Sequence, residues 1–247
     1  MLNERLTRMR NKLFDSRPCI TAERLVLETE AYQKFAGEAT PIFRAKVVKY
    51  IMEHMTTLIM DDELIVGTPT NKYRGANLHP EFQSSTEFYL PELDAFPLRK
   101  TDPYDISPED RELILKTLPY WEGKSMQDMS KKALPADILE RIHDDIITVG
   151  LTNGVSGETT CDHEKLLAVG LKGYIDECRD NISSTLCSSK EDQQRVDYWN
   201  ACIIQCEGLI EYAHRMADEA ERRFYHSGRS RPLFPGAWNN QAASQQS

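Results

Sequence analysis

Several features that mark common classes of protein are absent from this 247-residue sequence. It has no run of about 18 apolar residues, and its polar first ten residues lack the apolar centre of a secretory signal. Basic residues are in the minority, since 30 lysines and arginines face 39 acidic residues and leave a net charge of −9. We therefore expect a cytoplasmic protein without a membrane span. Nucleic acid is not expected as its main partner, because neutralising phosphates requires a basic face.

Metal-binding patterns are also missing. The six cysteines include no C-x-x-C pair and no cysteine–histidine pair at zinc-ligand spacing. Cys202 and Cys206 lie four residues apart, as half of a metal site would, but their apolar neighbours favour two buried, reduced thiols. The acidic run 61–63 is interpreted as a solvated turn. No metal is expected.

Helical signals dominate what is present. We expect a first helix ending near Pro18, a second that Thr21 caps and that runs to about Ala36, and a third over residues 40–59 that Thr40 caps and Pro41 opens. In the third, apolar side chains recur every three or four residues and predict a core-facing side. These side chains are Phe43, Val47, Ile51, Met55 and Leu58.

The segment 67–105 interrupts this helical pattern with five prolines. Long regular elements cannot run through them, so the segment predicts loops that wrap a larger body, with one short helix near residues 85–93. Such a long irregular segment is unusual unless it is functional or packs on another part of the protein. The apolar run 64–67 just before it is either a buried strand or an extended loop.

More helices are predicted in the second half. Ser107 caps one that ends near Leu118, and a helical pair follows through Ile142, with Pro135 opening its second member. A last helix repeats apolar residues from 199 to 220, which predicts one wide buried face. Residues 225–247 lose this periodicity and are expected to be a disordered or aberrant tail. The fold class is mainly α, with few short strands and long Pro-rich loops.

A glycine-rich loop over residues 148–164 stands out as the candidate site. Three glycines recur there within eight residues, a density that suits positive φ angles or close approach to a ligand. Asp162 is the expected N-cap of the helix that follows. Glu158 therefore lies just before a helix N-terminus, where a carboxylate is electrostatically tolerated and free to face a cavity.

Six collinear segments resemble the N-terminal region of glycyl radical enzymes, in the pyruvate formate-lyase-like branch. That branch includes glycerol and propanediol dehydratases, choline trimethylamine-lyase, isethionate sulfite-lyase and hydroxyproline dehydratase. The resemblance covers roughly residues 5–223. The segments are R-A-K-V-V-K-Y-I-M-E at 44–53, D-x-E-L-I-V-G ending at Gly67, Arg74-Gly75, Pro80-Glu81, D-P-Y-D-I-S-P-E-D at 102–110 and P-Y-W-E-G-K at 119–124.

The resemblance implies that residues 1–224 are the N-terminal helical layer around a ten-stranded α/β barrel. In the family, a glycine near the C-terminus holds a radical that a separate radical S-adenosylmethionine activating enzyme installs, and a mid-chain cysteine becomes a thiyl radical. Neither G-C-x-E nor R-V-x-G-[YF] occurs here. We therefore expect no bound cofactor, a truncated or frameshifted gene or a split subunit, an inactive chain when alone, and a homodimer only in full-length form.

The same resemblance assigns one functional position. Residues 157–167 align without gaps with the stretch where diol dehydratases have G-H and choline trimethylamine-lyase has G-D, which places Glu158 against the substrate hydroxyl as a general base. The alternative is a glutamate that hydrogen-bonds the glycine loop. Asn153, Thr159 and Cys161 are expected to line the pocket by proximity. Arg74 is either a carboxylate clamp or part of a buried ion pair.

Three functions remain open. The first is a C–O or C–N lyase of the dehydratase or amine-lyase kind, acting on a small hydroxylated molecule. The second is an acyltransferase like formate acetyltransferase, or a decarboxylase, which the acid at position 158 disfavours because it repels carboxylate substrates. The third is a non-catalytic helical module that binds a partner through an exposed apolar face.

Overall fold

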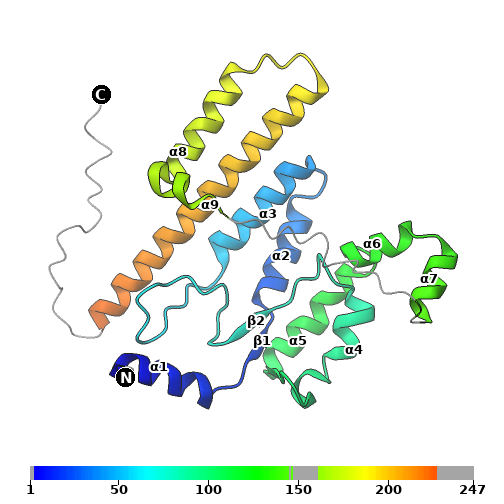
Figure 1. Cartoon of the computed structure of the whole chain (residues 1–247), viewed down its shortest axis with the longest axis vertical. Helices are drawn as coiled ribbons and strands as arrows, with labels where there is room; N and C mark the ends of the chain where they lie inside the picture. The colour runs from blue at the N-terminus through cyan, green and yellow to red at the C-terminus, as the bar shows by residue number, and fades with distance from the viewer. Residues whose placement is uncertain (1–2, 145, 147–160, 227–247) are drawn as a thin grey trace.

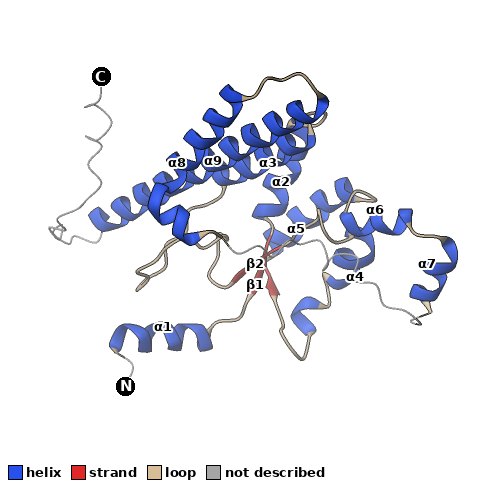
Figure 2. Cartoon of the chain, turned by 45° about the horizontal axis from the view of Figure 1, so that its top comes forward, coloured by secondary structure: helices blue, strands red, loops and turns tan. Residues whose placement is uncertain are grey.

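The computed structural model describes residues 3–144, 146 and 161–226, which form a mainly helical molecule with one small sheet (Figures 1 and 2). This confirms the expected fold class. Most of the glycine-rich loop and residues 227–247 of the expected tail lie outside the described residues. Within the described part, no helix is long and apolar enough to cross a membrane.

The longer helices follow the predicted order closely. They are α1 (Glu4–Asp15), α2 (Glu23–Lys34), α3 (Thr40–His54), α5 (Pro108–Thr117), α6 (Met126–Ala133), α7 (Ala136–His143), α8 (His163–Ser184) and α9 (Lys190–His226). Ser107 and Asp162 cap α5 and α8 as expected, each accepting a hydrogen bond from the main chain three residues on. A π-helical turn (Ser85–Tyr89) continues into α4 (Leu90–Glu92), which confirms the short helix predicted there.

Helix α2 is central because two hydrophobic cores meet on it. Leu25 belongs to a core with Trp121, Ile114 and the side chains around the π-helical turn. Ala31 belongs to a second core with α3 and α9. The indole nitrogen of Trp121 donates to Thr29 Oγ1 of α2 at 2.8 Å, so the large buried ring also keeps its polar atom bonded.

Three short parallel strands form the sheet, in the order β2-β1-β3. They are β1 (Cys19–Thr21), β2 (Gly75–Asn77) and β3 (Asp105–Ile106), with Ile20 opposite Ala76 on one side and Ile106 on the other. The sheet joins the two ends of the Pro-rich segment to the start of α2. None of the three strands was located from the sequence, because two or three residues carry no alternating pattern.

The expected helix caps at Thr21 and Thr40 are wrong. Thr21 lies in β1, and Ala22 is the N-cap of α2. Alanine has no side chain that can cap a helix. The Ala22 amide instead donates to Asp110 Oδ1 of α5 at 3.0 Å, so a side chain 88 residues away in sequence binds the start of α2. Thr40 is already helical and Ala39 precedes it. Helix α3 also ends at His54 rather than near Ile59.

Of the two alternatives for the run 64–67, the structure shows the loop, and Ile65 is 90% exposed. The last helix differs more from expectation. The wide face of α9 is covered on one side only: Ala201, Tyr212 and Met216 are buried, whereas Leu209 is exposed. Cys202 and Cys206 are half-buried rather than fully buried. Apolar periodicity predicts an apolar face on a helix, but it does not predict how much of that face other elements cover.

Candidate functional site: an aromatic cleft backed by buried charges

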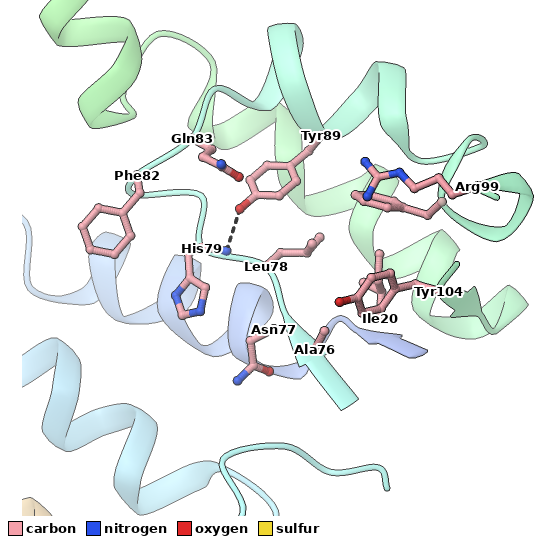
Figure 3. Close-up of a pocket in the computed structure, with 11 residues that line it drawn as sticks. Ile20, Ala76, Asn77, Leu78, His79, Phe82, Gln83, Tyr89, Arg99 and Tyr104 are labelled. Atoms are coloured by element: carbon pink, nitrogen blue, oxygen red, sulfur yellow. Dashed lines mark hydrogen bonds between the residues drawn. The ribbon is translucent and has the colours of Figure 1, made fainter. Parts of the chain in front are cut away.

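An open cleft of about 440 Å³ lies beside the sheet, where β1 and β2 meet the Pro-rich segment (Figure 3). Its walls are mostly apolar and aromatic, with four polar side chains among them. The lining residues are Ile20, Ala76, Asn77, Leu78, His79, Phe82, Gln83, Tyr89, Phe96, Arg99 and Tyr104. All but Ile20 come from the segment 67–105, so the long irregular segment has the packing role that its length suggested.

Three polar side chains of the cleft, those of Tyr89, Arg99 and Asn77, have partners within the fold. The Tyr89 hydroxyl accepts a hydrogen bond from the His79 amide at 2.9 Å, and burial raises the pKa of Tyr89 to about 12. The Arg99 guanidinium lies 4.3 Å from the centre of the Phe96 ring and pairs with Glu92. Asn77 donates to the Pro69 carbonyl at 2.9 Å. The cleft therefore offers shape and apolar surface rather than an unpaired charge.

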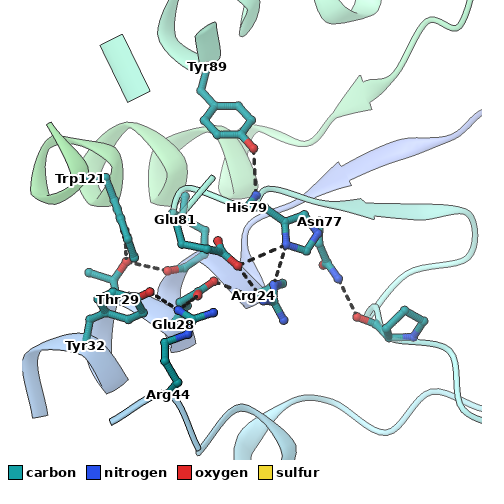
Figure 4. Close-up of polar contacts among 12 residues, drawn as sticks. Arg24, Glu28, Thr29, Tyr32, Arg44, Asn77, His79, Glu81, Tyr89 and Trp121 are labelled. Carbon is teal, nitrogen blue, oxygen red and sulfur yellow. Dashed lines mark hydrogen bonds and ion pairs between the residues drawn. The ribbon is translucent and has the colours of Figure 1, made fainter. Parts of the chain in front are cut away.

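A charged cluster lies directly behind His79 (Figure 4). Arg24 Nε of α2 donates to His79 Nδ1 at 3.1 Å, and Arg24 Nη2 contacts Glu81 Oε1 at the same distance. Glu28, one turn after Arg24, is buried next to them. These contacts fix the wall of the cleft to the central helix.

This arrangement favours binding over chemistry. Among the residues that the structure describes, no three His, Cys, Asp or Glu side chains are grouped so that they hold a metal ion. The lining set contains no cysteine, serine or lysine that acts as a nucleophile. An apolar or aromatic group is the ligand that such walls accept.

The main predicted site lies elsewhere in the chain. Glu158, Asn153 and Thr159 fall outside the described residues. Cys161 is described and exposed, and its carbonyl accepts a hydrogen bond from the His163 amide at 2.9 Å, just before α8 begins. Cys161 is not among the residues that line the cleft, and the role of all four residues in a pocket stays a prediction.

Arg74 has a local role that the sequence did not suggest. Its Nη1 donates to the Leu13 carbonyl at 2.9 Å and to the Ser16 carbonyl, both at the end of α1. The side chain is exposed and its backbone has a φ of 53°. Within the described part of the chain, Arg74 thus binds main-chain oxygens and not a carboxylate. Whether it also binds substrate stays a prediction.

Sequence reasoning missed the cleft and its charged cluster. His79 was not singled out, and Glu81 was noted only within the Pro80-Glu81 match. One available signal was the number of aromatic residues between 73 and 104, in a segment too rich in proline for regular structure. That signal indicates packing but not a cavity, because the cavity depends on how the loops fold back on β1.

Comparisons with known proteins agree with one another. The family model described as pyruvate formate lyase-like matches residues 2–226. The isethionate sulfite-lyase of Desulfovibrio desulfuricans is 28% identical over 86% of this chain and 27% of its own length. The indoleacetate decarboxylase of Tractidigestivibacter scatoligenes is 27% identical over 89% of this chain and 28% of its own length.

A solved structure gives the same result for the fold. The glycerol-bound glycerol dehydratase of Clostridium butyricum, described as B12-independent, matches with a TM-score of 0.85 and 29% identity. The match covers 92% of this chain and 29% of the dehydratase. The chain therefore spans less than a third of the length of its curated and structural relatives.

Proposed function

Because this chain belongs to the pyruvate formate lyase-like family, we propose that it forms the N-terminal helical part of a glycyl radical lyase. The enzyme breaks a C–O or C–N bond in a small hydroxylated substrate. The observation that carries the proposal is the close structural match to a glycerol dehydratase over 92% of the chain. A (2S)-3-sulfopropanediol dehydratase and a trans-4-hydroxy-L-proline dehydratase, at 28% and 27% identity, support the same reaction class.

In this proposal Glu158 is the general base that this part of the chain contributes. Its carboxylate accepts a hydrogen bond from the substrate hydroxyl and takes the proton as the neighbouring bond breaks. Asn153, Thr159 and Cys161 line the pocket around it. The protein radical of the complete enzyme supplies the hydrogen abstraction that starts the reaction. Helix α8 begins at His163, five residues after Glu158 in the sequence.

Partners follow from the same proposal. A radical S-adenosylmethionine activating enzyme installs the radical, and the complete enzyme is a homodimer. The chain itself binds no cofactor. The aromatic cleft has no part in this chemistry, because its Arg99 is paired with Glu92 and its lining holds no nucleophile.

A decarboxylase is the second candidate, since an indoleacetate decarboxylase is among the relatives. A negative Glu158 next to a substrate carboxylate disfavours this reaction through like-charge repulsion. A non-catalytic interaction module is the third candidate, and it rests on exposed apolar side chains such as Ile65, Leu64 and Leu167, which are 90%, 78% and 86% exposed. If these side chains are buried in the family-length protein, the observation that supports the third candidate is lost.

The first experiment is to read the DNA that follows the codon for Phe224 in all three frames. The proposal expects G-C-x-E and R-V-x-G-[YF] in the translated sequence. The encoded family-length polypeptide, activated without oxygen by its activating enzyme, should then show the doublet of a glycyl radical in electron paramagnetic resonance. Absence of both motifs in every frame, or a folded family-length protein without a radical signal, would contradict the proposal.

A further inference from the structure

Two glutamates are the most deeply buried carboxyl groups near the cleft, and the function proposed above uses neither. The side chain of Glu28, on α2, is 1% exposed, and that of Glu81, between β2 and the π-helical turn, is 5% exposed. Figure 4 shows the two side chains facing each other beside Arg24. We name Glu28 and Glu81 the carboxyl pair.

Three of the four oxygens of the carboxyl pair lack a hydrogen-bond donor if both members are ionised. Both oxygens of Glu28 and Oε2 of Glu81 are buried without a donor among the described residues. An ionised carboxylate only accepts hydrogen bonds, and leaving it unsatisfied in a buried site is costly. One proton on Glu28 changes this balance, because a protonated carboxyl is a donor and the Glu81 carboxylate that faces it is an acceptor.

Distances decide which member keeps the negative charge. Arg24 Nη2 donates to Glu81 Oε1 at 3.1 Å but lies 3.5 Å from Glu28 Oε2. The guanidinium of Arg44 reaches Glu28 only at 4.0 Å and also donates to the Tyr32 hydroxyl. Glu81 is therefore the better stabilised anion, and Glu28 is the member that holds the proton.

The electrostatics of the pair agree with this assignment. Burial raises the pKa of Glu28 from an ordinary value of 4.5 to about 8, and the charge of Glu81 adds to the increase. Burial also acts to raise the pKa of Glu81, but His79 and Arg24 outweigh it and lower that pKa to about 2. The other titratable groups that face the pair are Tyr32 and Tyr89, and burial raises the pKa of each to about 12. Neither phenol loses its proton in the neutral range.

We propose that Glu28 and Glu81 share one proton at neutral pH and act as a pH-sensitive latch between α2 and the wall of the cleft. While the proton is present, the pair holds the segment 78–83 against α2, and His79 stays in the cleft wall. When Glu28 loses the proton in mild alkali, two negative charges face each other in a buried site. The segment then separates from α2 and the cleft opens.

The latch predicts the sign of a pH effect on stability. Between pH 4.5 and about 8 the unfolded chain has lost the Glu28 proton while the folded chain keeps it. Stability from this group therefore falls as the pH rises through that window and is constant above it. Glu28→Gln is neutral at every pH, and its amide keeps a donor toward Glu81, so it should escape the loss.

The test is urea unfolding of the full 247-residue chain, followed by tryptophan fluorescence at pH values from about 5 to 9. The folding constant of Glu28→Gln divided by that of the wild type should rise by up to about tenfold per pH unit below pH 8 and then level off. Glu30→Gln is the matched control, since Glu30 is an exposed residue on the same helix. Its ratio should stay flat. A flat ratio for Glu28→Gln, or a Gln variant that does not fold near pH 6, would overturn the proposal.

A second measurement does not depend on unfolding. In a chain labelled with ¹³C at glutamate carboxyls, one resonance should titrate with a midpoint near pH 8 and be absent from Glu28→Gln. Amide hydrogen exchange in residues 78–83 should also be faster in the wild type than in Glu28→Gln at pH 9, with no difference at pH 6. If every glutamate resonance titrates below pH 6, no proton is shared and the latch does not exist.

Discussion

At the scale of single residues, buried polar side chains join segments that are far apart in the sequence. Asp110 is the best example. Its Oδ1 accepts from the Ala22 amide at 3.0 Å, its Oδ2 accepts from the Ser107 hydroxyl at 2.8 Å, and it pairs with Lys72. One carboxylate thus caps α2, supports its own helix start and holds the loop before β2.

The first prediction concerns this carboxylate. Burial alone would raise the pKa of Asp110, but the hydrogen bonds from Lys72, Ala22 and Ser107 lower it below its ordinary value of 3.8. Its stabilising effect is therefore present above about pH 4 and lost as the pH falls through the lowered pKa. Asp110→Asn should cost roughly 1–3 kcal/mol in urea unfolding at pH 7, and much less near pH 3.

Asp105→Asn is the control for this prediction. Asp105 pairs with Arg17 at 3.2 Å, and the two side chains are 51% and 52% exposed. Its replacement should change the free energy of unfolding by less than about 0.5 kcal/mol. Equal effects of the two substitutions at pH 7 would show that Asp110 does not have the role described.

At the scale of elements, the crossing of α3 and α9 depends on one glycine. A Cβ added at Gly208 would lie 2.9 Å from Lys49 Cα and 3.1 Å from Lys49 Cβ, so backbone would have to move. Gly208→Ala should therefore destabilise the chain by about 1–3 kcal/mol, although alanine favours a helix by about 1 kcal/mol. Thermal unfolding by circular dichroism measures this. Gln205→Ala, at an exposed position on the same helix, should be nearly neutral, and a stabilised Gly208→Ala variant would contradict the close crossing.

Two hydrogen bonds from one arginine also join α9 to α3. Arg215 of α9 donates to the carbonyls of Met52 and Met55, each at 2.7 Å, and so satisfies main-chain oxygens at the end of α3. The single ammonium group of lysine cannot form both hydrogen bonds with the geometry of the guanidinium. Arg215→Lys should therefore lower the free energy of unfolding by roughly 1–2 kcal/mol. The same change at Arg195, whose side chain is 67% exposed, should leave the free energy of unfolding unchanged. Equal losses at the two positions would contradict the role of the two Arg215 hydrogen bonds.

At the scale of the whole molecule, local signals and long-range contacts differ in how well the sequence reveals them. Helices α5, α8 and α9 were predicted because caps and apolar periodicity are local features. The three strands were not located, because each is only two or three residues long and is fixed by neighbours more than 50 residues away in sequence. The cap that Asp110 supplies to α2 was missed for the same reason.

The functional prediction depends on resemblance rather than on local physics. Family membership came from collinear segments, and the family model that matches residues 2–226 confirms it. No pattern in the sequence pointed to the aromatic cleft or to the carboxyl pair, since both form only when the Pro-rich segment folds back on β1 and α2. The role of Glu158 also stays a prediction, because that residue lies outside the described part of the structure.

The most direct measurement is product analysis of the family-length enzyme that contains residues 1–224, after anaerobic activation, with a panel of small diols and amino alcohols. A lyase with Glu158 as its base should release water or an amine and form an aldehyde or ketone. Glu158→Gln should lower kcat by about 10²–10⁴-fold and leave the radical signal intact. Release of carbon dioxide or formate instead, or full activity in Glu158→Gln, would contradict the account.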